Sequence, residues 1–193
     1  RNLSEHADLS AYVTTDCNDM VVDRNGNAYV GNFGFDFAGG DEPRSTCLVL
    51  VRPDGSTKLA ADDLWFPNGA VLTPDGIKLI VAETFSKQLT SFDISADGSL
   101  GNRQVWASLG DLSPDGIALD KSGAIWVAAV LSKTVVRVEK GGVITHSLPL
   151  EQESIACALG GVDEEFLLLC TSAHLDAEEC LRYRSARIES IAL

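Results

Sequence analysis

Three oxygen-bearing side chains occupy matching places in a repeated sequence pattern. Asn18, Asn68 and Asp115 each precede a short run of strand-forming residues, and a turn containing glycine separates that run from a second one. Two amide oxygens and one carboxylate form a hard-oxygen set suited to Ca²⁺ and, less tightly, to Mg²⁺ or Mn²⁺. A cation held by the three residues would polarise a carbonyl group and acidify bound water. The pattern therefore predicts a divalent-metal site.

The spacing of the repeats predicts how these residues meet. The units begin near residues 18, 68, 115 and 155, at steps of 50, 47 and 40 residues. A period of 40 to 50 residues with several short strands per unit is typical of β-propeller blades. The innermost strand of every blade starts on the same face beside the central channel. We therefore expect an all-β propeller that brings Asn18, Asn68 and Asp115 to the channel mouth.

Only four blades are visible in residues 1–193, interpreted as one propeller domain. Six blades are common in closed rings, so about two N-terminal blades are expected to be missing. Residues 4–12 are interpreted as the outer strand of a preceding blade. Residues 186–193 alternate like a strand that needs a partner, and unpaired blade edges would favour self-association.

Two features of the sequence have more than one interpretation. Asn or Asp before Gly is also an ordinary turn pattern, and this interpretation is adopted for Asp54, Asp75 and Asp97, which adjoin hairpins. The three site residues instead precede inner strands. Near Asn68, a second ambiguity concerns three phenylalanines that alternate in a glycine-rich stretch. They form either an apolar wall over the site or packing beneath a loop: Phe33, Phe35 and Phe37.

Composition excludes several functions. The net charge of −13, from 28 acidic and 15 basic residues, repels phosphate backbones and argues against nucleic acid as a partner. No apolar run is long enough to span a bilayer, so no membrane association is expected. Five cysteines without a CxxC pair indicate neither a zinc-finger site nor a disulfide framework, and favour a reducing, cytoplasmic setting. The three histidines share no ligand spacing.

The same motifs resemble those of the family that contains SMP-30 (regucalcin), gluconolactonases and luciferin-regenerating enzyme. The likeness covers nearly the whole chain, with its motifs in order. The matching stretches are Asn18-Asp19-Met-Val-Val-Asp, Phe66-Pro67-Asn68-Gly69 with Thr73-Pro-Asp-Gly, and Ser113-Pro114-Asp115-Gly116-Ile-Ala-Leu-Asp with Ile125-Trp126-Val-Ala.

This resemblance implies a six-bladed propeller with one catalytic divalent metal at the channel mouth. It implies that Asn68 and Asp115 are metal ligands, that Asp115 is also the base that activates water, and that Asn18 lies beside the metal or substrate. The family's N-terminal glutamate ligand has no counterpart here. Asp16 stands where sugar-lactone members often have an arginine that contacts the substrate. This difference argues against an aldonolactone.

The resemblance favours a metal-dependent lactone hydrolase that acts on a small-molecule lactone. Ca²⁺ is the expected cofactor, with Mg²⁺, Mn²⁺ or Zn²⁺ as alternatives. In this mechanism Asp115 takes a proton from water while the metal polarises the carbonyl. Two other interpretations stay open. One is a non-catalytic, incomplete propeller that binds metal or serves as an interaction module, and the other is a phosphotriesterase on the same scaffold.

Overall fold

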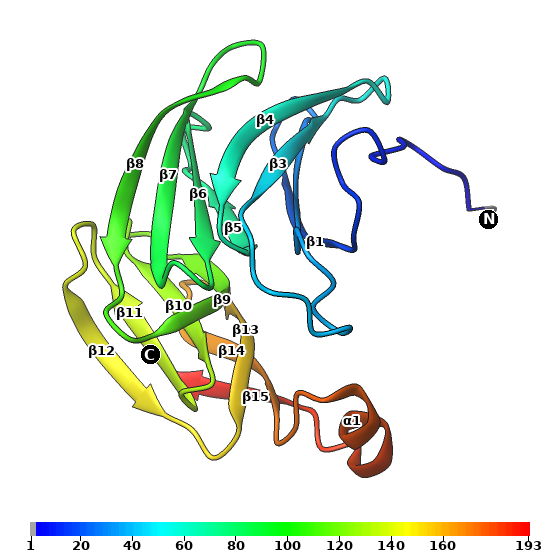
Figure 1. Cartoon of the computed structure of the whole chain (residues 1–193). Coiled ribbons are helices and arrows are strands. Elements are labelled where there is room, and N and C mark those ends of the chain that lie inside the picture. Colours follow the sequence, from blue (N-terminus) through cyan, green and yellow to red (C-terminus); the bar gives the residue numbers. More distant parts are fainter. Residues whose placement is uncertain (1–2) are drawn as a thin grey trace.

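The computed structural model describes residues 3–193, which form four antiparallel sheets side by side around an open arc (Figure 1). Each of the first three sheets has four strands, hydrogen-bonded in sequence order, and the fourth sheet has three. The all-β propeller with four blades is therefore confirmed. The strands of the first two sheets are β1 (Cys17–Val22), β2 (Ala28–Asn32), β3 (Thr46–Val51), β4 (Thr57–Leu64), β5 (Pro67–Leu72), β6 (Lys78–Glu83), β7 (Gln88–Ile94) and β8 (Leu100–Ser108).

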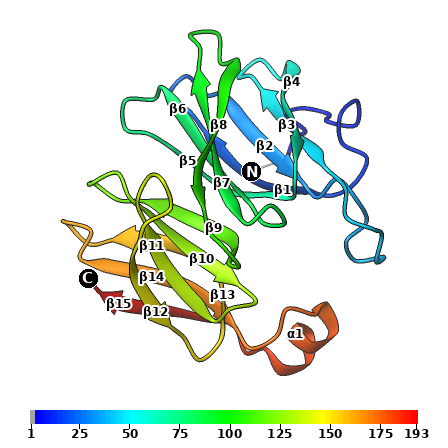
Figure 2. The same ribbon diagram turned by 60° about the vertical axis from the view of Figure 1, so that its left-hand side comes forward.

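The third and fourth sheets continue the arc, and Figure 2 shows them beside each other. The inner strands contact one another in the order β1, β5, β9, β13, so the four blades are neighbours in sequence order. The remaining strands are β9 (Ser113–Leu119), β10 (Ile125–Val130), β11 (Thr134–Val138), β12 (Ile144–Pro149), β13 (Glu153–Gly160), β14 (Phe166–Ser172) and β15 (Arg187–Ala192).

The core lies between the sheets, because the central strands of the first three blades are covered on both faces. In β6, Leu79 packs with the first blade, while the next residue, Ile80, packs with the third. Side chains alternate between the two faces of a strand, so a strand buried on both faces has a continuous apolar sequence. Trp126 and Leu167 fill the space between the third and fourth blades in the same way.

The hairpins follow the turn chemistry that their sequences predict. Asp54, Asp75 and Asp97 each accept a hydrogen bond from the backbone amide two residues later. The glycine after each of these aspartates has a φ between 75° and 81°, a conformation that glycine adopts without a steric penalty. The interpretation of these three aspartates as turn residues is therefore confirmed.

The N-terminal segment differs from its expected structure. Residues 4–12 form no strand; they are irregular, with a turn at residues 10–12. Ala7 and Leu9 pack instead against the outer face of the first sheet, beside Val49, and Val13 joins them there. A strand needs a hydrogen-bonding neighbour. Among the described residues none is available at this position, and the segment covers apolar side chains instead.

The C-terminal strand has its partner inside the chain. β15 pairs with β14 over its whole length, from Arg187 opposite Thr171 to Ala192 opposite Phe166. Between these strands lies the helix α1 (Ala177–Tyr183), where Asp176 caps the N-terminus by accepting a hydrogen bond from the Glu179 amide. No helix within residues 3–193 has the length and apolar character needed to cross a membrane.

Candidate functional site

The predicted site residues lie at β-bulges that recur at the same register in three blades. Between Cys17 and Met20, β1 has one residue more than its partner β2. The same irregularity occurs in β5 after Pro67 and in β9 after Pro114. The residues inside these three bulges are Asn18-Asp19, Asn68-Gly69 and Asp115-Gly116. A bulge redirects side chains that would otherwise alternate between the two faces of a strand, so the three polar residues share the same local geometry.

The glycines of these motifs allow the inner strands to approach closely. A Cβ atom on Gly69 would lie 2.7 Å from the backbone oxygen of Asp115, and one on Gly116 would lie 2.7 Å from the Cα atom of Ala156. Neither glycine has a positive φ. Asn68-Gly69 and Asp115-Gly116 are therefore not turns. The glycines are required for strand-to-strand contact beside the site residues.

Asp115 is a half-buried carboxyl group with a strongly perturbed pKa. Burial, and then the negative charge of Asp19, raise its pKa from 3.8 to about 7, while a hydrogen bond from Asn68 acts in the opposite direction. The pKa of Asp19 is itself raised by partial burial. The charge of a carboxylate in the first blade thus affects a carboxyl group in the third blade. Perturbed carboxyl groups of this kind are typical of functional sites.

Asn68 is buried, and hydrogen bonds connect it through Thr84, the residue after β6, to the inner strand β9. Its side-chain nitrogen donates to Thr84 Oγ1 at 3.3 Å, and that hydroxyl donates to the backbone oxygen of Pro114 at 2.7 Å. The chain of hydrogen bonds therefore ends on the residue before Asp115. Because the side-chain nitrogen of Asn68 donates to Thr84, its carbonyl oxygen is the atom that could bind a cation.

Asn18 is half-buried and bridges the first two blades. Its side-chain nitrogen donates to the backbone oxygen of Pro67 at 3.1 Å, directly before Asn68. The structure thus brings Asn18 next to the strand that carries Asn68. In the described part of the first blade, however, the residue whose charge raises the pKa of Asp115 is Asp19 and not Asn18.

A buried carboxylate holds the segment that leads into Asn68. Glu83, at the end of β6, is fully buried and accepts hydrogen bonds from the Trp65 amide at 2.8 Å and from the hydroxyl of Thr90. Arg103 lies 3.2 Å from the same carboxylate. Phe66, between Trp65 and the start of β5, has a φ of 58°, a conformation that is strained for a phenylalanine. The Glu83 contacts therefore stabilise an unusual backbone path beside the site.

The donor set fits a divalent cation, although it is short of ligands. The negative charge of Asp19 disfavours ionisation of Asp115. No arginine, lysine or histidine in residues 3–193 forms an ion pair with either carboxyl group. A cation between them would remove that repulsion. In the same residues no group of three or more His, Cys, Asp or Glu side chains is placed to hold a metal. The amide oxygens of Asn68 and Asn18, together with water, would have to complete the coordination of Ca²⁺.

The sequence pattern missed two residues of this site. Asp19 follows Asn18 directly, and in a regular strand the two side chains would point to opposite faces, so only the bulge brings Asp19 into play. Thr84 lies 16 residues after Asn68 and has no motif around it. The available signal for Asp19 was its alignment with Gly69 and Gly116 in the repeat, where it is the one charged residue.

Comparison with known proteins agrees with this architecture. Residues 1–174 match the family model described as the SMP-30/Gluconolactonase/LRE-like region. Regucalcin of Danio rerio is 28% identical over 92% of this chain and 62% of its own length. L-arabinolactonase of Azospirillum brasilense is 28% identical over 83% of this chain and 53% of its own length.

A solved structure resembles the fold over a similar span. The calcium-binding protein regucalcin from Agrobacterium tumefaciens superimposes with a TM-score of 0.72 at 21% identity, over 91% of this chain and 60% of that one. The chain thus spans between half and two thirds of the length of these relatives. Because the family model matches nine tenths of its sequence, the chain belongs to the SMP-30/gluconolactonase/LRE-like family.

Proposed function

We propose that this chain carries the catalytic half-site of a metal-dependent lactone hydrolase. The observation that supports the proposal is Asp115, a half-buried carboxyl group in the bulge of β9, whose pKa is raised by burial and by the charge of Asp19. The family includes lactonases, among them the L-arabinolactonase that matches this chain. Asp19, Asn68 and Asp115 would supply some of the oxygen donors for such a reaction.

In the proposed reaction Asp115 is the general base. Opening of a lactone ring by water requires a group that accepts a proton from the attacking water. In the metal-free chain, burial and the charge of Asp19 raise the pKa of Asp115 to about 7, and a cation bound beside Asp115 would lower that pKa and keep the carboxylate ionised to accept the proton. Asn68, on the neighbouring inner strand β5, would help to orient the carboxylate toward that water.

Asn68, Asp115 and either Asn18 or Asp19 are the residues that would hold the metal. A bound divalent cation would polarise the ring carbonyl and stabilise the negative charge that develops on it. Ca²⁺ is the proposed ion, because the donors are all hard oxygens and the related protein from Agrobacterium tumefaciens is described as calcium-binding. Mg²⁺, Mn²⁺ and Zn²⁺ are the alternatives to be compared.

Turnover of a panel of lactones, with and without Ca²⁺, tests the proposal. Asp115→Asn should lower kcat by about 10²- to 10⁴-fold, because it removes the base and keeps the size of the side chain. The matched control is Asp75→Asn, an exposed hairpin aspartate in the second blade. Unchanged turnover in Asp115→Asn, or equal losses in both variants, would contradict the assignment.

A second candidate is a non-catalytic metal-binding module. The supporting observation is the absence of a group of three acidic, histidine or cysteine ligands within residues 3–193. Calorimetric titration separates the two candidates: the module binds Ca²⁺ without hydrolysing any lactone on the panel. A phosphotriester substrate in the same panel tests the third possibility, which the same architecture would accommodate.

A further inference from the structure

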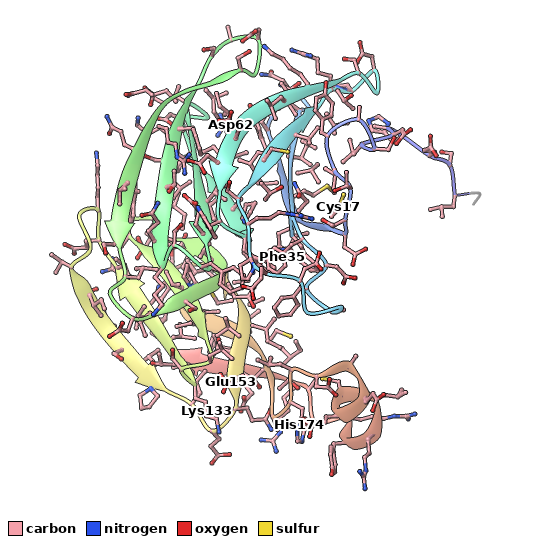
Figure 3. The ribbon with its side chains drawn as sticks, in the orientation of Figure 1. Cys17, Phe35, Asp62, Lys133, Glu153 and His174 are labelled. Atoms are coloured by element: carbon pink, nitrogen blue, oxygen red, sulfur yellow. The ribbon has the colours of Figure 1, made fainter. Side chains whose placement is uncertain are left out.

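Five of the seven phenylalanines of the chain gather at the end of the blades that carries the site. The rings of Phe33 and Phe66 are stacked at 4.8 Å and join the first blade to the second. Phe85 packs edge-on against Phe66 at 5.1 Å, and Phe37 lies 5.6 Å from Phe66. Figure 3 labels Phe35 where the loop between β2 and β3 leaves the sheet. We call these rings the phenylalanine wall: Phe33, Phe35, Phe37, Phe66 and Phe85.

The backbone of this wall is continuous with that of the site. Phe66 is separated from Asn68 by one proline, and Phe85 directly follows Thr84, which receives the hydrogen bond from Asn68. The Phe33 amide donates to the backbone oxygen of Asp16 at 3.1 Å, two residues before Asn18. A molecule held at Asn68 and Asp115 would therefore have the phenylalanine wall as its neighbour.

Packing beneath a loop explains only part of the wall. Phe35 and Phe66 are 2% and 8% exposed and form a buried base. Phe37 and Phe85 are 57% and 42% exposed and form an apolar rim. Apolar side chains that stay exposed next to a set of convergent polar groups are characteristic of a ligand pocket.

We propose that the substrate is a lactone whose ring carries an apolar alkyl or aryl substituent, which packs against the phenylalanine wall. This inference rests on the proposed lactonase function. A polyhydroxylated sugar lactone needs hydrogen-bond partners for its hydroxyl groups, and phenyl rings provide none. Two polar side chains near these rings are already engaged. Asn32, at the end of β2, donates to the Cys47 backbone oxygen at 2.8 Å and accepts from the Thr46 hydroxyl, and Asp36 accepts from the Gly39 amide.

The experiment compares δ-nonalactone with D-glucono-δ-lactone on the full chain in the presence of Ca²⁺. The expected kcat/KM is about tenfold or more higher for δ-nonalactone. Phe37→Ser and Phe85→Ser should each lower kcat/KM for δ-nonalactone by about tenfold and leave the sugar lactone unaffected. The matched control is Phe166→Ser, because the Phe166 side chain is 41% exposed and lies in the fourth blade, at the end opposite to the candidate site. Equal or better turnover of the sugar lactone, or an equal loss in the control, would overturn the inference.

Binding to the Asp115→Asn variant separates this inference from the proposed function. Saturation-transfer NMR with δ-nonalactone and with the sugar lactone does not require turnover. If no lactone is hydrolysed but δ-nonalactone binds preferentially and loses that preference in Phe37→Ser, the apolar subsite stands and the proposed hydrolysis fails. If the two lactones bind equally, the apolar subsite fails whatever the turnover.

Discussion

Removal of the charge of Asp115 should stabilise the protein when no metal is present. Burial and Asp19 raise the pKa of Asp115 from 3.8 to about 7, so the folded chain holds this carboxylate in an unfavourable ionised form above neutral pH. At about 1.4 kcal/mol per pH unit, this rise corresponds to at most about 4 kcal/mol. Because Asp115 is only half-buried, solvent screening reduces the expected effect to about 2 kcal/mol. Asp115→Asn should recover that amount at pH 8.

The stabilisation by Asp115→Asn should increase as the pH rises. Below pH 4 the carboxyl group is protonated in both the folded and the unfolded chain, so the Asp115→Asn substitution should change the free energy of unfolding little. Between pH 4 and 7 the unfolded chain loses the proton while the folded chain keeps it, and the stability of the original protein falls. Above pH 7 both forms are ionised and the difference from Asp115→Asn is constant.

Urea unfolding in the presence of a chelator, at pH 4 and at pH 8, measures the effect. Ca²⁺ should reverse the order at pH 8, because it stabilises the original chain by binding the folded state and has a weaker site in Asp115→Asn. The matched control is Asp54→Asn. Hydrogen bonds from Ser56 lower the pKa of Asp54, so loss of this carboxylate should not stabilise the protein. If Asp115→Asn is less stable than the original chain at pH 8, or equally affected at both pH values, the reasoning is refuted.

Three further substitutions or modifications test the geometry around the site. Gly69→Ala should lower the free energy of unfolding in urea by about 1–3 kcal/mol and weaken Ca²⁺ binding, because the new Cβ atom meets the Asp115 backbone. The control Gly101→Ala, with open space around the new Cβ atom, should change the free energy of unfolding by no more than about 0.5 kcal/mol. Thr84→Val keeps the shape but breaks the link from Asn68 to Pro114, and calorimetry should show roughly a 10-fold loss of Ca²⁺ affinity; an unchanged affinity would exclude a positioning role. Burial raises the pKa of Cys157 to about 12, so iodoacetamide at pH 8 followed by peptide mass mapping should find Cys157 unmodified in the folded chain and exposed Cys17 modified.

The repeat period was sufficient to predict the fold because each blade is a local structure. Four strands joined by short hairpins pair in sequence order, and the Asp-Gly turns mark where each hairpin reverses. The strand prediction was wrong for a segment whose structure depends on a distant neighbour. Residues 4–12 have strand-like alternation, but a strand also requires a neighbour, and the sequence alone does not show whether one is present.

The site was predictable in part for the same reason. Asn18, Asn68 and Asp115 could be identified from their common place before inner strands, since a propeller brings those places together. Asp19 could not, because period-two alternation assigns it to the opposite face from Asn18. The bulge that changes this lies beside Gly31 of β2, where an added Cβ atom would meet the Pro67 backbone oxygen of the next blade at 3.0 Å and the Asp19 backbone oxygen at 3.3 Å.

By itself, the sequence determined the all-β class, the blade repeat and the common position of Asn18, Asn68 and Asp115 before the inner strands, because hydrophobic alternation and turn residues act over a few neighbouring positions. Only the tertiary structure decided the surroundings of these residues. The pKa of Asp115 depends on burial and on a carboxylate 96 residues earlier in the chain, and the phenylalanine wall joins rings from two blades. Desolvation, charge repulsion and ring stacking depend on distances in space, and these distances exist only once the blades have packed together.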